Sequence, residues 1–283
     1  MKFCTRIFSL VTVTILISFS GQAVFAEKAI IFSTAPTQSV EDTKKKYQPI
    51  ADYLTKVIGR KVKLVPAENF IEYSRALIGG KYDLVFDGPQ FVAWRMERDN
   101  STRHKVLVKL PGKLRYVVVV RKDLKITSTR RLAGKKVCAL ASPNLLTLGF
   151  LNLFSNPSSM PVMTGIENFK KGLACAINGR GVAVILRDKF WNKISQKKPK
   201  LKRELKLFYT AKEAWPHRAF SISSKVDSKT RLKIQRALLS SAALRPARAI
   251  LKQYKAKRFV PASSAEYAGY GRLLKPIWGF HEQ

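Results

Sequence analysis

The stretch YDLVFDGPQFVAW, residues 82–94, decides the fold. Its first half is a short apolar run typical of a buried strand, and the run stops at Asp87-Gly88-Pro89, before aromatic residues follow. Asp before Gly-Pro is common turn chemistry. The pattern predicts a strand, a rigid turn carrying a carboxylate, and a helix. The role of that carboxylate depends on the elements around it.

Outward from this stretch, apolar runs alternate with amphipathic ones. The order strand, helix, strand, helix, strand predicts a parallel sheet with helices on its faces. The segments are KAIIFSTA (28–35), SVEDTKKKYQPIADYLTKVIG (39–59), KVKLVPA (61–67), FIEYSRALIGG (70–80) and YDLVFDG (82–88).

The helix expected at 39–59 has clear boundaries, with Ser39 as N-cap and Gly59 at its end. Pro49 lies inside this pattern and would interrupt the backbone hydrogen bonds. We therefore expect the helix to begin near Tyr47 or to be kinked.

The second half of the chain repeats this alternation. RYVVVVRKD (115–123) is a β-branched run suited to a strand buried on both faces, and RRLAGKKVCALASPN (130–144) indicates a short helix, a strand and a polar loop. Helices are expected at 144–154, 168–179, 229–241 and 245–254. The chain therefore contains two α/β units. In such sheets, ligands collect beyond the carboxyl ends of the strands, which points to the loops 34–39 and 87–91.

The N-terminus has the features of an export signal. Lys2 and Arg6 form a basic start, residues 7–19 are an apolar core, and AVFA ends at Ala26. The core is shorter than the ~20 residues that span a bilayer. We expect a cleaved signal peptide over 1–26, a soluble mature chain, and a location in the periplasm or outside the cell.

The formal net charge of +35 attracts anions and acidic surfaces. It fits nucleic acid, an acidic envelope or membrane surface, an anionic solute, or a solubilising surface without a specific partner. Export and the lack of an aromatic-rich basic motif argue against nucleic acid. The dense run KKPKLKRELK (197–206) is interpreted as a solvated turn and helix start.

Two cysteines remain after cleavage, Cys138 in an expected strand and Cys175 in an expected helix. In an oxidising compartment they can pair, and we favour that disulfide over two buried free thiols. No His or Cys cluster has metal-ligand spacing, so neither a metal nor a cofactor is predicted.

In their order and spacing, several segments resemble the periplasmic substrate-binding proteins of phosphate, phosphite and phosphonate ABC transporters. The resemblance runs from about residue 28 to the C-terminus. The segments are APTQ (35–38), YQPIADYLTKVIGRKVKL (47–64), ALIGGKYDLVFDGPQFV (76–92), RRLAGKKVCALASPN (130–144) and RFVPASSAEYAGYGRLLKPIWGF (258–280).

The resemblance implies an α/β fold of two lobes, each a mixed, mostly parallel sheet flanked by helices. Lobe 1 would comprise 27–114 and 217–283, and lobe 2 would comprise 115–216. Two crossing strands, at 115–123 and 218–224, would join them. The implied function is binding without chemistry: a monomer that closes over a small, anionic solute and delivers it to an ABC permease.

The anion-binding motif of the family is only partly present. The family holds its anion with hydroxyls at the start of a second-lobe helix, but SPNLLTLGF (142–150) places Leu145 and Leu146 among them. Phe91 stands where the family has tyrosine. We therefore do not expect the usual phosphonate specificity, and predict a ligand larger or less charged than phosphonate.

Twelve residues are expected at the ligand site, either from segments at the predicted cleft or from the stretch 142–150 that corresponds to the family's anion-binding motif: Thr37, Gln38, Asp87, Gly88, Pro89, Gln90, Phe91, Ser142, Asn144, Thr147, Trp215 and His217. Asp87 would either accept from a ligand or cap its turn, and His217 would either touch ligand or be structural. Trp94, Tyr47 and Tyr73 are expected in packing.

Two other functions stay open. The closed lobes could dock on a membrane signalling receptor, or the cleft could be degenerate and the basic surface could adhere to acidic envelope polymers. An enzyme is not expected, because no nucleophile elbow, zinc-protease motif or P-loop occurs.

Overall fold

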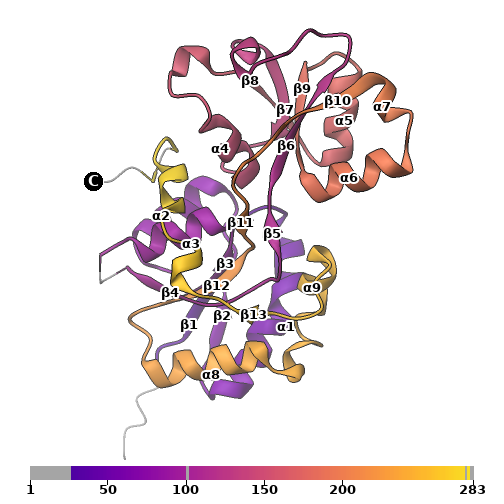
Figure 1. The fold of residues 1–283 in the computed structure, drawn as a ribbon. Coiled ribbons are helices and arrows are strands. Elements are labelled where there is room, and N and C mark those ends of the chain that lie inside the picture. Colours follow the sequence, from indigo (N-terminus) through magenta and orange to yellow (C-terminus); the bar gives the residue numbers. More distant parts are fainter. Residues whose placement is uncertain (1–26, 100–101, 278, 281–283) are drawn as a thin grey trace, which may run out of the picture.

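The computed structural model describes residues 27–99, 102–277 and 279–280, which form two α/β lobes connected by thin crossing segments (Figure 1). The expected signal peptide lies outside the described residues. Across the described ranges, no helix combines the length and the apolar character needed to cross a membrane.

Lobe 1 is built on a six-stranded sheet in the order β13-β4-β12-β3-β1-β2. Strands β1, β2 and β3 are parallel, whereas β12 runs antiparallel between β3 and β4. The strands are β1 (Ile30–Thr34), β2 (Val62–Leu64), β3 (Leu84–Asp87), β4 (His104–Lys109), β12 (Ala219–Ser223) and β13 (Val260–Pro261). The helices are α1 (Val40–Ile58), α2 (Phe70–Ile78), α3 (Pro89–Met96), α8 (Ser228–Leu239) and α9 (Arg248–Tyr254).

Lobe 2 is built on a five-stranded sheet in the order β10-β6-β9-β7-β8. Parallel pairs join β7 to β8 and β9, while β6 is antiparallel to β9 and β10. The strands are β6 (Tyr116–Arg121), β7 (Lys136–Leu140), β8 (Val162–Ile166), β9 (Ala183–Arg187) and β10 (Leu205–Thr210). The helices are α4 (Leu145–Leu151), α5 (Phe169–Ile177), α6 (Asp188–Lys197) and α7 (Leu201–Glu204).

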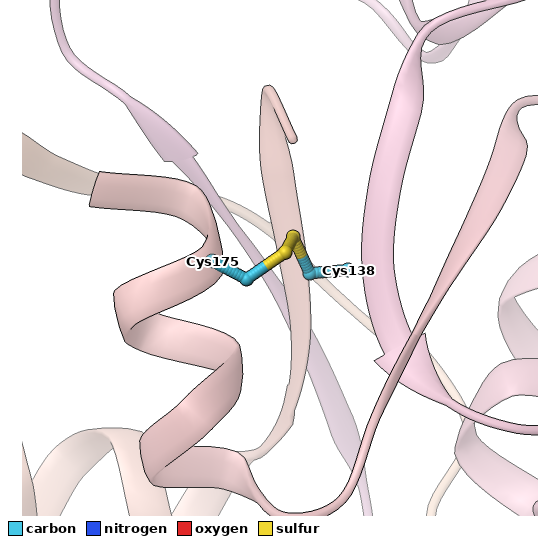
Figure 2. Close-up of a disulfide and its surroundings, with 2 residues drawn as sticks. All are labelled: Cys138 and Cys175. Carbon is cyan, nitrogen blue, oxygen red and sulfur yellow. A yellow bond between two sulfur atoms is a disulfide. The ribbon is translucent and has the colours of Figure 1, made fainter. Parts of the chain in front are cut away.

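A disulfide joins the sheet of lobe 2 to a helix. Cys138 on β7 and Cys175 on α5 are bonded with their Cα atoms 6.3 Å apart, as Figure 2 shows. Both residues are buried in one apolar cluster with Leu173 and Val184. The favoured pairing of the two cysteines is therefore present.

The crossing strands are not the ones expected from the sequence. The runs at 115–123 and 218–224 form β6 and β12, each inside a single sheet, because Val117–Val120 and Ala219–Ser223 are fully buried and need neighbouring strands on both sides. The lobes are instead joined by the short antiparallel pair β5 (Lys113–Leu114) and β11 (Trp215–Pro216). We propose lobe boundaries at residues 115 and 217, immediately beyond this pair.

Helix α1 is continuous through Pro49, so the expected start near Tyr47 is wrong. Pro49 lies on the exposed side, while Tyr47, Ile50 and Leu54 on the opposite face are buried. Burial of that face and the predicted caps outweigh the loss of one backbone hydrogen bond. The Ser39 hydroxyl accepts from the Asp42 N–H, and Gly59 ends the helix with φ of 73°.

The C-terminal segment makes a second connection between the lobes. The 3-10 helix η5 (Tyr270–Leu274) contacts both α3 of lobe 1 and α4 of lobe 2. Its Leu273 and Leu274 belong to an apolar cluster that also holds Trp94 and Leu148. The lobes therefore meet along one side of the junction as well as through β5 and β11.

Candidate functional site

A cavity of about 450 Å³ lies between the two lobes. It is lined by residues that follow the carboxyl ends of strands in both sheets, such as Thr37 after β1, Gly88 after β3 and Ala141 after β7. This is the position in which open α/β sheets collect ligands. The cavity is therefore the candidate binding site.

Seven of the twelve expected site residues line this cavity. They come from both lobes, six from lobe 1 and Asn144 alone from lobe 2. The residues are Thr37, Gly88, Pro89, Gln90, Phe91, Asn144 and His217.

Four of the remaining five are directed elsewhere. Gln38 bonds to Thr43 and Lys46 on α1, and the Thr147 hydroxyl donates to the Leu140 carbonyl at 2.6 Å. Ser142 is exposed outside the cavity lining. Trp215 is buried in the crossing pair, where its ring stacks on Tyr116 with centroids 5.6 Å apart. None of these four residues belongs to the lining of the cavity.

The fifth, Asp87, is neither a ligand acceptor nor a turn cap. It is fully buried, and both its oxygens accept from the Arg95 guanidinium at 2.7 Å. The Tyr73 hydroxyl donates to the same carboxylate at 2.5 Å. Burial, and then the Asp87 charge, raise the pKa of Tyr73 well above its usual range, so this hydroxyl keeps its proton. The carboxylate at the end of β3 is thus a structural ion.

This ion pair holds the turn at Gly88-Pro89, which lines the cavity. Arg95 is on α3, which begins at Pro89, so the pair connects the end of β3 to the helix that follows it. The guanidinium also donates to the Ser221 hydroxyl at 2.9 Å, which anchors α3 to β12. A Cβ at position 88 would lie 2.5 Å from Oε1 of Gln90, so a larger residue there would displace the Gln90 amide.

Gln90 connects the two lobes across the cavity. Its Nε2 donates to the Pro143 carbonyl of lobe 2 at 3.0 Å, and the side chain is only 3% exposed. Because a carbonyl can only accept, this bond fixes the orientation of the amide. Oε1 of Gln90 is left buried, without a hydrogen-bond partner among the described residues.

His217 is held as a neutral ring. Its Nδ1 accepts from the Arg218 backbone N–H at 2.8 Å, so the proton is on Nε2. Burial, followed by the positive charges of Arg218, Arg187 and Lys189, lowers the pKa of His217 to about 3. The ring therefore contributes a hydrogen-bond donor at neutral pH and no charge.

Among the described residues, the charged side chains that line the cavity are Arg218 from lobe 1 and Arg187 and Glu167 from lobe 2. Within the described ranges, no carboxylate forms an ion pair with either arginine. Nη1 of Arg218 and Nε of Arg187 are buried without hydrogen-bond partners in the part of the chain that the structure describes. Both side chains are half-buried, and the Arg218 guanidinium lies over the Tyr254 ring at 5.6 Å. A buried nitrogen without an acceptor is costly, and a bound anion would supply one.

The rest of the cavity is mostly apolar. Leu145 and Leu146 line it from lobe 2, and Phe70 and Phe91 from lobe 1, where their rings stack 6.2 Å apart at 12°. The Leu146 amide is not available to a ligand, since it donates to the Asn144 side chain at 3.0 Å. The Asn144 cap therefore occupies one of the N–H groups at this helix start.

Sequence analysis missed both arginines. Arg187 ends an apolar strand and Arg218 directly follows His217. These two positions were the sequence features that could have indicated a place at the site. The signal was hidden because the chain has 53 lysines and arginines, most of which face solvent. The expected packing roles of Trp94, Tyr47 and Tyr73 are confirmed by their burial. Among the described residues, no group of three His, Cys, Asp or Glu side chains could hold a metal ion.

Comparison with known proteins relates most of the chain to one family. Residues 32–267 match the family model of the periplasmic substrate-binding protein of phosphonate ABC transporters. The Mycolicibacterium smegmatis phosphate-import protein PhnD is 29% identical over 129 residues, or 44% of this chain. The match spans 40% of the length of that relative.

Two solved structures share the fold. PhnD1 of Prochlorococcus marinus, in complex with methylphosphonate, is 18% identical with a TM-score of 0.62, covering 88% of this chain and 98% of that one. A Xanthomonas citri protein bound to ATP is 14% identical with a TM-score of 0.70, covering 90% and 99%. Both are two-lobed α/β proteins like this one.

Proposed function

This chain belongs to the family of periplasmic substrate-binding proteins of phosphonate ABC transporters, and we propose that it captures an anion between its lobes and delivers it to an ABC permease. Membership supports a periplasmic location and a role in solute binding rather than catalysis. The cavity between the lobes is the site of capture. The delivery step rests on the family, and the anionic charge of the ligand rests on the geometry.

The observation that carries the proposal is the pair of unpaired arginines, one from each lobe. Arg187 and Arg218 repel each other when the lobes approach. An anion bound between them would attract both guanidinium groups and so offset this repulsion. The bound anion therefore favours the closed arrangement over the open one, which is ligand-driven closure by population shift. PhnD1, which shares this fold, was solved with an anion, methylphosphonate.

Calorimetric titration of the mature protein with methylphosphonate and with inorganic phosphate tests the charge of the ligand. Loss of one buried charge partner costs roughly 2–5 kcal/mol, so Arg218→Gln and Arg187→Gln should each weaken anion binding by at least about thirtyfold. Arg121→Gln, which removes an exposed guanidinium paired with Asp123, is the matched control and should bind normally. Equal affinities in all four proteins would contradict the proposal.

Closure is tested separately by small-angle X-ray scattering. An anion that binds should reduce the radius of gyration of the wild-type protein. The same addition should leave the radius of gyration of Arg218→Gln unchanged. Delivery is tested by reconstituting uptake in vesicles that carry an ABC permease of the phosphonate type. A receptor that binds the closed protein without uptake would favour sensing over transport.

A further inference from the structure

The cavity holds more apolar surface than a bare oxyanion needs. Its volume, about 450 Å³, falls in the range of roughly 300–1,000 Å³ typical of sites for drug-sized ligands. An inorganic tetrahedral anion at the two arginines would leave the leucine and phenylalanine walls without contact. Such unfilled apolar space loses dispersion contacts on every side.

The cationic donors of the cavity lie near one another, because the charges of Arg187 and Arg218 both act on His217. The Glu167 carboxylate and several neutral polar residues also line the cavity. The charged donors are Arg187 and Arg218, and His217 lies beside Arg218. Leu145 and Leu146, both less than 10% exposed, stand on the lobe 2 wall and donate nothing. A ligand that contacts both the arginines and these leucines therefore has a charged end and an apolar end.

From this division we propose that the ligand is an organic anion whose acid group lies between Arg187 and Arg218 and whose aromatic or branched apolar body packs on Leu145, Leu146, Phe70 and Phe91. This inference rests on the proposed capture of an anion in the same cavity. It adds the chemical class of the body and assigns Leu145 and Leu146 as residues that determine specificity.

The acid group and the apolar body have separate tests. Calorimetry on wild-type protein compares phenylphosphonate, methylphosphonate and inorganic phosphate, which share the acid oxygens and differ in apolar bulk. We expect phenylphosphonate to bind at least roughly tenfold tighter than methylphosphonate, in line with the effect of added carbon groups in apolar pockets. Equal affinity for all three would overturn the inference while leaving anion capture intact. No binding of any of the three would overturn both.

A variant pair locates the apolar contact. Leu145→Ser should weaken phenylphosphonate by about tenfold and should leave inorganic phosphate unchanged or tighter, because a hydroxyl replaces an apolar wall. Leu151→Ser, at the far end of the same helix and outside the cavity lining, is the matched control. If Leu145→Ser does not fold, Phe70→Leu provides the same test from lobe 1, where Phe70 is only partly buried. An unchanged preference for phenylphosphonate in the folded variant would remove these residues from the site.

Discussion

The two lobes face the same cavity but are stabilised by different chemistry. In lobe 1, the layer beneath the cavity is polar: Asp87, Arg95, Ser221 and His104 are all buried and linked by hydrogen bonds. Among the described residues, lobe 2 has two buried polar side chains, Thr147 and Ser195, and both carry hydroxyl groups. Its core is built of β-branched strands and one disulfide.

Because of this difference, the stability of each lobe should respond to different conditions. Directional ion pairs and hydrogen bonds hold the lobe 1 wall, so that wall depends on charge and on pH. Packing and a covalent bond hold the lobe 2 wall, so that wall depends on volume and on redox state. The comparison also separates two kinds of arginine: Arg95 has a full set of protein partners, whereas Arg187 and Arg218 retain unpaired nitrogens.

Breaking the lobe 1 ion pair should have the largest effect on stability. Asp87→Ala leaves the Arg95 guanidinium buried without its carboxylate, and such breaks cost about 3–5 kcal/mol of unfolding free energy. Urea titration followed by tryptophan fluorescence measures this. The double variant Asp87→Leu/Arg95→Met should recover much of the loss, because no buried charge remains. Asp123→Ala, at the exposed pair with Arg121, should leave stability essentially unchanged.

A small loss in Asp87→Ala, similar to that in Asp123→Ala, would contradict the view that lobe 1 depends on this pair. It would mean that water reaches Arg95 or that another acceptor replaces the carboxylate.

Reducing the disulfide should have the next largest effect and should act through lobe 2. Cys138 and Cys175 are separated by 37 residues, and closing a loop of that size typically contributes roughly 2–4 kcal/mol. We expect a phosphine reductant to lower the unfolding free energy by this amount, which is measured as a lower urea midpoint. The double variant Cys138→Ala/Cys175→Ala should show the lower midpoint without reductant and no further change with it. A reductant effect that persists in the double variant would place its cause outside the bridge.

The fold was largely accessible from the sequence because each element has a local signal. The strands at 82–88 and 61–67, and the caps Ser39 and Gly59, all depend on neighbouring residues only. The crossing pair was not accessible, because β5 and β11 have only two residues each and no periodicity. The longer runs nearby were more visible, and tertiary burial placed them inside the sheets.

The site was accessible in part, and for a physical reason. Loop position predicted Gly88, Gln90 and His217 correctly as cavity residues, since the carboxyl ends of strands converge. The role of Asp87 was not predictable, because Arg95 comes within bonding distance of it only when α3 is packed against the end of β3. In the same way, an arginine that lacks a carboxylate partner can be recognised only when the positions of the carboxylates in the fold are known.

The pH dependence of stability should also belong to lobe 1, because both described histidines are buried there. Burial and then the Arg95 charge lower the pKa of His104 well below its usual range, and the pKa of His217 is about 3. The unfolded chain protonates these rings near pH 6.5, which the folded chain does not do. Their stabilising contribution is therefore present above that pH and is lost as the pH falls through it.

For His217 the expected loss between pH 7 and pH 5 is about 2 kcal/mol of unfolding free energy. Urea titrations of ligand-free protein over this range measure the slope. His217→Gln should reduce the slope and His104→Gln should reduce it further. A flat profile in wild type would show that the rings become protonated in the folded protein and that lobe 1 is open to water.

The bond between the lobes should give the smallest effect, and it sharpens the comparison because neither lobe alone contains it. Gln90 donates to the Pro143 carbonyl, and one neutral hydrogen bond contributes about 1 kcal/mol. Gln90→Leu keeps the apolar stem but removes the donor, so the closed arrangement should lose about fivefold in population. Anion affinity should fall by a similar factor while the urea midpoint changes little, since each lobe keeps its own core. Gln48→Leu, which removes an exposed bond to Asp52 on α1, is the control for loss of an amide. If Gln90→Leu instead lowers the unfolding free energy as much as Asp87→Ala does, Gln90 stabilises the core of lobe 1 and not the closed arrangement of the two lobes.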